Sequence, residues 1–371
     1  MQNKNAIELI QEQGQSVWYD NVRRGLIDSG ELAKIIADGV TGLTSNPTIF
    51  EKAISGSSDY DAPITSLLSS EISVDEIYER LVTNDIRRTA DLLRPIYEST
   101  YGEDGYACLE VSPRLAHDTN GTVDEAKRLF SLLNVPNVMI KVPATTEGIP
   151  AIRELIGAGI NVNVTLIFSL LAYGKVMEAY ISGIEDYVAS GGKPADIASV
   201  ASFFVSRVDT SVDGILQELL HSGQESVKAL FGKTAVSNAK LAYRDFKSTF
   251  AQDRFSILRK AGARPQRPLW ASTSTKNPAY SDLLYVESLI GSDTVNTMPP
   301  ETLSALLDHG QVTHTIEEGQ KEAEEHIGNL EAAGINMSAV TDELLANGVK
   351  SFSDSFEALM GKLAEKMEEL A

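Results

Sequence analysis

The chain has 371 residues, with 52 acidic and 32 basic side chains and therefore a formal net charge of −20. This charge argues against nucleic acid or an anionic membrane as the main partner, because both are themselves negative. A small anionic substrate would need a locally basic pocket. The single cysteine, Cys108, excludes an internal disulfide, and no apolar run reaches the ~18 residues typical of a membrane span. We therefore expect a soluble, cytoplasmic protein.

Short apolar runs alternate with helix-length segments along the whole chain. Several runs are dense in Val, Ile and Leu, which is typical of strands buried on both faces of a parallel sheet. Between them, apolar residues at three- and four-residue spacing predict helices over 74–97, 169–188 and 281–290. The eight predicted strands lie at 16–19, 42–45, 106–111, 138–143, 161–168, 199–205, 268–273 and 294–298.

Eight strand–helix repeats predict an α/β fold of the (β/α)8 TIM-barrel type. The alternative is an open doubly wound sheet, but no Gly-rich phosphate turn follows the first strand. Extra helices are expected after strand 2 (47–104), after strand 6 (209–267) and at the C-terminus (301–371). We find no low-complexity linker, so we expect one domain over 1–371. The apolar stripe of the last helix indicates packing on the barrel.

Polar side chains stand where the predicted strands end. In a barrel these carboxyl-terminal ends face the active site, whereas a purely structural core would place apolar residues at most of them. Read in chain order, the polar positions are Asp20, Asn46, Glu110, Lys141, Asn163, Thr165, Ser202, Ser272 and Ser274.

Lys141 is the most specific of these signals, because it interrupts the apolar strand Val138-Met139-Ile140-Lys141-Val142-Pro143. Burial lowers the pKa of a lysine, and the neutral amine can attack a carbonyl to form a Schiff base. Asp20 and Glu110, on different strands, could share the proton transfers that this chemistry needs. The structural alternatives are an ion pair of Lys141 with Glu110 and, for Asp20, an N-cap or a salt bridge with Arg23 or Arg24.

Neutral polar groups and two cations complete the predicted pocket. Asn46, Asn163, Thr165 and Ser202 offer hydrogen bonds to a polyhydroxylated substrate such as a sugar. Arg207, at the start of the loop after strand 6, could bind a phosphate as a bidentate fork, or it could pair with Asp209. Lys276 is a second cation near the end of strand 7. The five histidines form no metal pair on one helix face, and no P-loop or GxSxG motif is present.

Five of these strand ends together resemble transaldolase. The resemblance runs from Asp20 to the last helix, and its motifs follow the order of the family on successive strands. They are Thr44-Ser45-Asn46-Pro47, Leu109-Glu110-Val111-Ser112, Ile140-Lys141-Val142-Pro143-Ala144-Thr145, Asn161-Val162-Asn163-Val164-Thr165-Leu166-Ile167-Phe168-Ser169 and Ser202-Phe203-Phe204-Val205-Ser206-Arg207-Val208-Asp209. The length and the Thr273-Ser274-Thr275-Lys276-Asn277-Pro278 stretch are similar to the longer bacterial subfamily.

The resemblance implies a class I aldolase barrel that uses neither a metal nor an organic cofactor. Such enzymes transfer a dihydroxyacetone unit from fructose 6-phosphate or sedoheptulose 7-phosphate to glyceraldehyde 3-phosphate or erythrose 4-phosphate, in the non-oxidative pentose phosphate pathway. Sugar phosphates would then be the partners of a monomer or homodimer.

The same resemblance implies a role for each matching residue. Lys141 matches the Schiff-base lysine, and Asp20 matches the acid/base that takes the C4 hydroxyl proton. Glu110 and Thr165 match the pair that holds the catalytic water. The substrate-binding positions are Asn46, Asn163, Ser202, Phe204 and Arg207. The shorter members carry a second phosphate-binding arginine after strand 7, and here Lys276 with Ser272 would replace it.

Two other functions stay open at this point. A Schiff-base aldolase would cleave a sugar phosphate by the same steps but would then protonate and release the three-carbon fragment, which makes it a lyase. A non-catalytic barrel would act only as a binding protein and would lock Lys141 in an ion pair. Activity without an acceptor aldehyde separates the lyase from the transferase.

Overall fold

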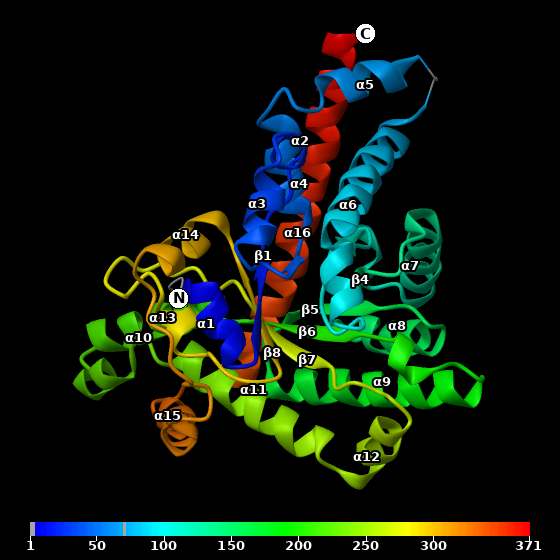
Figure 1. Cartoon of the computed structure of the whole chain (residues 1–371). Coiled ribbons are helices and arrows are strands. Elements are labelled where there is room, and N and C mark those ends of the chain that lie inside the picture. Colours follow the sequence, from blue (N-terminus) through cyan, green and yellow to red (C-terminus); the bar gives the residue numbers. More distant parts are fainter. Residues whose placement is uncertain (1–3, 70–71) are drawn as a thin grey trace.

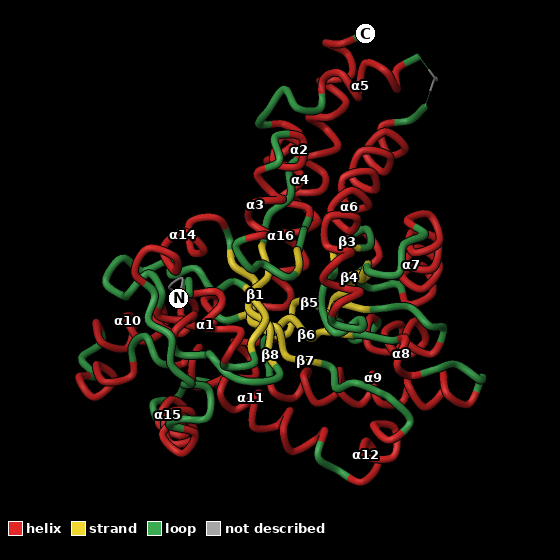
Figure 2. Tube along the Cα trace, in the orientation of Figure 1, coloured by secondary structure: helices red, strands yellow, loops and turns green. Residues whose placement is uncertain are grey.

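The computed structural model describes residues 4–69 and 72–371. Its eight strands, which lie together at the centre of the molecule in Figure 2, form one closed barrel in chain order with parallel neighbours. The predicted TIM barrel is therefore confirmed. The strands are β1 (Gln15–Tyr19), β2 (Gly42–Leu43), β3 (Ala107–Glu110), β4 (Val138–Pro143), β5 (Val162–Ile167), β6 (Ser199–Phe204), β7 (Arg267–Ala271) and β8 (Thr294–Met298).

Sixteen α-helices accompany the barrel in the described part of the chain. Helices α7, α8 and α9 follow β3, β4 and β5, as the alternating pattern predicts. The helices are α1 (Ala6–Glu12), α2 (Arg24–Asp28), α3 (Glu31–Ala37), α4 (Pro47–Ser55), α5 (Asp61–Leu68), α6 (Val74–Ser99), α7 (Thr119–Leu133), α8 (Gly148–Gly157), α9 (Leu170–Ala189), α10 (Ser206–His221), α11 (Thr234–Phe250), α12 (Asp253–Lys260), α13 (Leu284–Glu287), α14 (Pro300–His309), α15 (Gln320–Ala332) and α16 (Met337–Leu370).

The three predicted insertions are helical. Helices α4, α5 and α6 follow β2, helices α10, α11 and α12 follow β6, and α14, α15 and α16 follow β8. The long helix α16 packs against α4, α5 and α6, and together they project from the barrel (Figure 1). The apolar stripe of α16 is buried in these contacts, at Phe352, Phe356, Leu359 and Leu363.

The strand register brings the predicted chemistry together. Glu110 on β3 pairs with Lys141 on β4, and Lys141 pairs in turn with Asn163 on β5. Thr165 lies opposite Pro143 at the end of β4. Since neighbouring strands lie about 4.8 Å apart, side chains at one level of the barrel come within reach of one another.

β5 carries an irregularity directly after Thr165. Its register with β6 shifts between Val164 and Ile167, and Leu166 has φ of 59°. A non-glycine residue in this left-handed region is strained and needs support from its surroundings. Helix α16 supplies some of it, because the backbone of Gly348 approaches the Leu166 side chain so closely that a Cβ there would lie 3.0 Å from it.

The structure corrects two predicted elements. The helix expected over 281–290 is shorter and covers only Leu284–Glu287. The strand expected over 268–273 ends at Ala271, because Ser272 has φ of 55° and leaves the extended conformation. The hydroxyl of Ser272 is thereby brought to 3.0 Å from that of Ser206, at the start of α10.

Candidate active site

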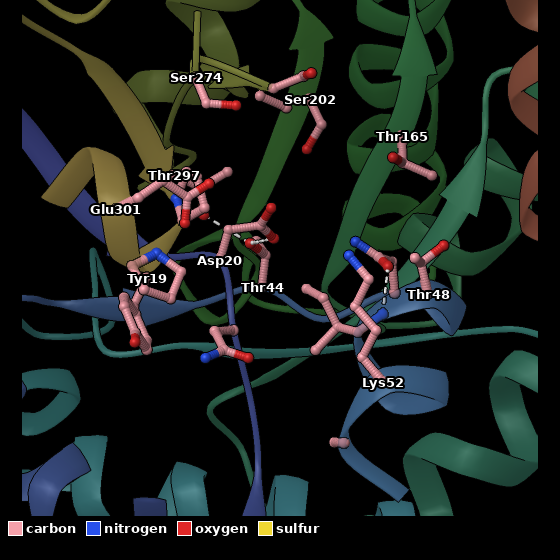
Figure 3. A pocket seen from close by; sticks show the side chains of 18 of the residues that line it. Tyr19, Asp20, Thr44, Thr48, Lys52, Thr165, Ser202, Ser274, Thr297 and Glu301 are labelled. Atoms are coloured by element: carbon pink, nitrogen blue, oxygen red, sulfur yellow. Dashed lines mark hydrogen bonds between the residues drawn. The ribbon is translucent and has the colours of Figure 1, made fainter. Parts of the chain in front are cut away.

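A cavity of about 650 Å³ opens at the carboxyl-terminal ends of the strands. Side chains from several strand ends point into it, among them Asp20, Thr165, Ser202 and Ser274 (Figure 3). Nine of the eleven predicted site residues line the cavity: Asp20, Asn46, Lys141, Thr165, Ser202, Phe204, Arg207, Ser272 and Lys276. The two that do not line it are Glu110 and Asn163.

Lys141 is held in the cavity wall by two contacts. Its Nζ donates a hydrogen bond to the carbonyl oxygen of Ser45 at 2.8 Å and lies 3.5 Å from Oε2 of Glu110. Both charged side chains are more than nine-tenths buried. Burial raises the pKa of Glu110, although the charge of Lys141 opposes the shift. The amine and the carboxyl group are therefore close enough to exchange a proton through small movements or one water.

Asp20 follows β1 and is bound by a hydroxyl group instead of an arginine. Thr44 donates a hydrogen bond to Oδ1 of Asp20 at 2.6 Å, one of the dashed contacts in Figure 3. The neighbouring arginines have other partners, since Arg23 pairs with Asp59 and Arg24 with Asp85. The salt bridge considered for Asp20 is therefore absent from the described residues. Burial raises the pKa of Asp20, while the Thr44 bond and the charge of Lys141 partly counteract this.

The amides and hydroxyls predicted to bind a sugar divide into two layers. Asn46 caps α4, and its Oδ1 accepts the backbone N–H of Ile49 at 3.0 Å. Thr165 and Ser202 reach the cavity itself. Asn163 lies beneath them, is fully buried, and accepts the Ser202 hydroxyl at 2.7 Å. Asn163 therefore acts on the cavity through Ser202 in this structure.

Arg207 has no acidic partner among residues 4–69 and 72–371. Its guanidinium lies 5.4 Å from the ring centroid of Phe204 and lines the cavity, and burial lowers its pKa. The ion pair with Asp209 that the sequence left open is wrong, because Asp209 accepts the N–H of Ala235 at 2.7 Å and the hydroxyl of Tyr285 at 2.9 Å. A half-buried arginine with free donors suits an anionic ligand.

The second cation lies on the same side of the cavity. Lys276 lines the wall, and its Nζ donates to the hydroxyl of Ser274 at 2.6 Å. Ser272 also lines the wall, beside Ser206 at the start of the helix that carries Arg207. Arg207, Lys276, Ser272 and Ser274 therefore bring two positive charges and two hydroxyl groups to the wall of this cavity.

Sequence reasoning missed several residues of this wall. Thr44 could have been found, since it stands one residue beyond β2 and begins the recognised motif Thr44-Ser45-Asn46-Pro47. The hydroxyl of Thr297, on β8, lies 2.6 Å from that of Thr44, and this threonine did not stand out because its strand also carries Thr294 and Asn296. Phe352 comes from α16, about 150 residues after the last motif, and its stripe only indicated packing. Contacts between residues so far apart in the sequence depend on how the helix packs in the folded structure, which the sequence pattern does not show.

Two kinds of feature are absent from the described part of the chain. No three side chains among its histidines, cysteines, aspartates and glutamates come together in an arrangement that could hold a metal ion. None of its helices combines the length and the apolar character needed to cross a bilayer.

The fold and the site define an α/β barrel with a buried lysine among carboxyl and hydroxyl groups at the strand ends. The profile of the Transaldolase/Fructose-6-phosphate aldolase family matches residues 17–363. The chain is 47% identical to the transaldolase of Trichodesmium erythraeum over 99% of this chain and 98% of that protein. It is also 47% identical to the transaldolases of Saccharopolyspora erythraea, over the full length of both chains, and of Thiobacillus denitrificans, over 97% and 99%.

The chain belongs to the Transaldolase/Fructose-6-phosphate aldolase family. Its full-length relatives support transaldolase function, and the protein is an enzyme of the transferase class. The general role of the family lies in the pentose phosphate pathway.

Proposed function

We propose that the protein transfers a dihydroxyacetone unit from sedoheptulose 7-phosphate or fructose 6-phosphate to glyceraldehyde 3-phosphate or erythrose 4-phosphate, through a Schiff base on Lys141. The observation that carries this proposal is the position of Lys141, buried beside Glu110 yet part of the cavity wall. A ketose C2 carbonyl placed there meets a nucleophile and a proton donor together.

Each step of the proposed reaction has a group in place. Lys141 attacks C2, and Glu110 with Thr165 exchanges protons through water while the imine forms. Asp20 removes the proton of the C4 hydroxyl, and the C3–C4 bond breaks as its electrons move into the iminium. The aldose phosphate leaves, and the three-carbon enamine stays bound until an acceptor aldehyde arrives.

The cationic end of the cavity is proposed to bind the sugar phosphate. Arg207 supplies a fork of donors, and Lys276 with Ser272 supplies a point charge and a hydroxyl. Asn46, Ser202 and, beneath it, Asn163 are proposed to hold the substrate hydroxyls, while the Phe204 ring shapes the pocket. Because phosphorylated sugars are the proposed substrates, we also propose a cytoplasmic location.

The test is trapping of the imine. Incubation with fructose 6-phosphate and borohydride should leave a reduced three-carbon adduct on the Lys141 peptide, which mass spectrometry locates. Lys141→Ala should fold, give no adduct and lose essentially all turnover, whereas exposed Lys193→Ala should match the native enzyme. An adduct on another lysine, or substantial turnover by Lys141→Ala, would contradict the assignment. Steady release of dihydroxyacetone without an acceptor would show a lyase instead.

Asp20→Ala provides the second half of this test. Since Asp20 is proposed to act in cleavage and not in imine formation, the variant should still be trapped by borohydride but should release aldose phosphate slowly. Equal loss of trapping and cleavage would contradict this division of labour.

A further inference from the structure

A second cavity, of about 190 Å³, lies on the other side of Glu110. Helices α4, α6, α7 and α16 and the end of β3 contribute to its wall. The two cavities share one residue, Asn46. Much of the inner wall is apolar or aromatic: Phe50, Tyr78, Val82, Leu129 and Phe356.

Glu110 belongs to the wall of this second cavity, whereas Lys141 and Thr165 belong to the first. The carboxyl group therefore stands between the two spaces, with Oε2 directed to within 3.5 Å of the lysine amine. That oxygen is buried and has no hydrogen-bond partner among the described residues. A carboxylate can accept several hydrogen bonds, so Glu110 has unused capacity for a water molecule.

The outer end of the second cavity is charged. Arg128 on α7 donates to Oε1 of Glu79 at 3.0 Å and to Oε2 of Glu125 at 2.9 Å, and all three residues line the cavity. Their side chains are between 24% and 49% exposed. Helices α6 and α7, which carry Glu79 and Arg128, are neighbours beside the barrel (Figure 1). The cavity thus runs from a partly exposed ion-pair cluster to the carboxyl group of Glu110.

The proposed reaction needs water at Glu110 while the first cavity is full. Imine formation joins Nζ to C2, breaks the C2–O bond and releases that oxygen as water: the ketone and the ammonium group give the iminium and one water. Release of the product ketose is the reverse and consumes one water. A sugar phosphate in the first cavity blocks the direct path from solvent to Lys141.

We propose that the second cavity is a water-access site, through which water reaches and leaves Glu110 while substrate occupies the first cavity. The proposal rests on the Schiff-base function proposed above. Substrate and water would then reach Lys141 by separate routes, the sugar from the strand ends and the water from between α6 and α7. The largely apolar wall holds water weakly and so favours passage over storage.

Filling the second cavity tests the proposal. Val82 is 2% exposed and lines it, so Val82→Phe and, independently, Leu129→Phe should occupy its volume. Ile86→Phe is the matched control, because Ile86 lies one turn further along α6, is equally buried and lines neither cavity. Rapid quenching with borohydride measures imine formation, and release of aldose phosphate measures C3–C4 cleavage.

We expect the filled variants to form the imine at least 10-fold more slowly than Ile86→Phe, with cleavage per imine formed unchanged. Enzyme preloaded with the three-carbon unit should still consume acceptor aldehyde in a fast burst, because that bond forms without water, and should then release ketose slowly. Unchanged imine formation in the filled variants, or equal slowing of cleavage, would overturn the proposal.

A measurement on the unmodified enzyme keeps the test decisive if the variants unfold. A high-resolution crystal structure should show ordered water within hydrogen-bonding distance of Glu110 in the second cavity. A dry cavity, or one that holds only an adventitious apolar additive, would contradict water access. Failure of the native enzyme to form a Lys141 adduct would instead contradict the proposed function, so the two failures are distinguishable.

Discussion

Two hydroxyl groups, from the neighbouring strand ends of β2 and β8, are linked to Asp20. The Thr44 hydroxyl donates its one proton to Asp20, so the contact of 2.6 Å with Thr297 requires Thr297 to donate to Thr44. This chain of donors favours the charged carboxylate. The Thr44 hydrogen bond lowers the pKa of Asp20 and so counteracts the effect of burial, which raises this pKa and favours the protonated acid. The base needed for cleavage therefore depends on residues that do not themselves react.

Thr44→Val should weaken that base. Without the Thr44 bond the pKa of Asp20 rises further, so a larger fraction is protonated and the acid limb of the cleavage rate moves to higher pH. A hydrogen bond to a charged group contributes about 1.5 kcal/mol, which corresponds to a shift of the acid limb by about one pH unit and to roughly tenfold slower cleavage on the acid side of that limb. Single-turnover release of aldose phosphate across a pH series is the measurement, with borohydride trapping expected to be nearly unchanged.

Thr48→Val is the matched control for this change. Thr48 lines the same cavity, but its hydroxyl lies 2.8 Å from that of Ser355 and makes no hydrogen bond to Asp20. The control should keep the acid limb of the native enzyme. An identical shift in both variants would mean that the Thr44 bond does not set the protonation of Asp20.

At the scale of elements, two tyrosines join the segment after β7 to helix α10. Tyr280 donates to Oδ2 of Asp213 at 2.7 Å, and Tyr285 donates to Oδ2 of Asp209 at 2.9 Å. The segment carries Lys276 and the helix carries Arg207. The tyrosine contacts therefore fix the spacing of the two cations that are proposed to share one phosphate.

Tyr280→Phe should loosen this spacing without touching the substrate. We expect the KM for glyceraldehyde 3-phosphate to rise about 5-fold, since a lost hydrogen bond of roughly 1 kcal/mol would weaken phosphate binding. The kcat and the KM for unphosphorylated glyceraldehyde should change little. Exposed Tyr101→Phe is the control. An equal rise in KM for both aldehydes would indicate a general structural defect, contrary to a role in phosphate positioning.

How much of the structure could be predicted from the sequence also differs from element to element. Strands and their polar ends were predictable, because buried parallel strands are apolar runs and a single lysine or glutamate stands out in them. The pairing of Asp209 was not, since its partners Ala235 and Tyr285 lie 26 and 76 residues further along the chain. The short helix α13 was overestimated, because helical spacing continues through residues that form turns.

At the scale of the whole molecule, the barrel and the projecting helices both contribute residues to the wall of each cavity. Helix α16 contributes Phe352 to the first cavity and Phe356 to the second, and it contacts β5 through Gly348 and Leu166. The sequence predicted that this helix packs on the barrel, and it does contact β5, but its apolar stripe is buried mainly against α4, α5 and α6, and this packing also shapes the site. Because the last helix completes the cavity wall and contacts the barrel, we expect the barrel and the projecting helices to fold together.

We therefore expect the chain to unfold in a single cooperative transition, as one domain over 1–371. Its two tryptophans, Trp18 on β1 and Trp270 on β7, report on the barrel by fluorescence, while far-ultraviolet circular dichroism reports on all the helices. The two signals should coincide in a urea titration. Separate midpoints would contradict the single domain and show that the projecting helices form their own folding unit.

Phe356→Ala extends this test to the contact between α16 and α6. The Phe356 ring packs edge-on against Tyr78, with centroids 5.3 Å apart, and is 4% exposed. Its removal should lower the free energy of unfolding by about 3 kcal/mol. If the molecule is one cooperative unit, the tryptophan transition must shift as far as the helical one, although neither tryptophan lies on α6 or α16. A shift confined to circular dichroism would mean that the barrel does not sense the loss and folds independently of the helices that complete its active site.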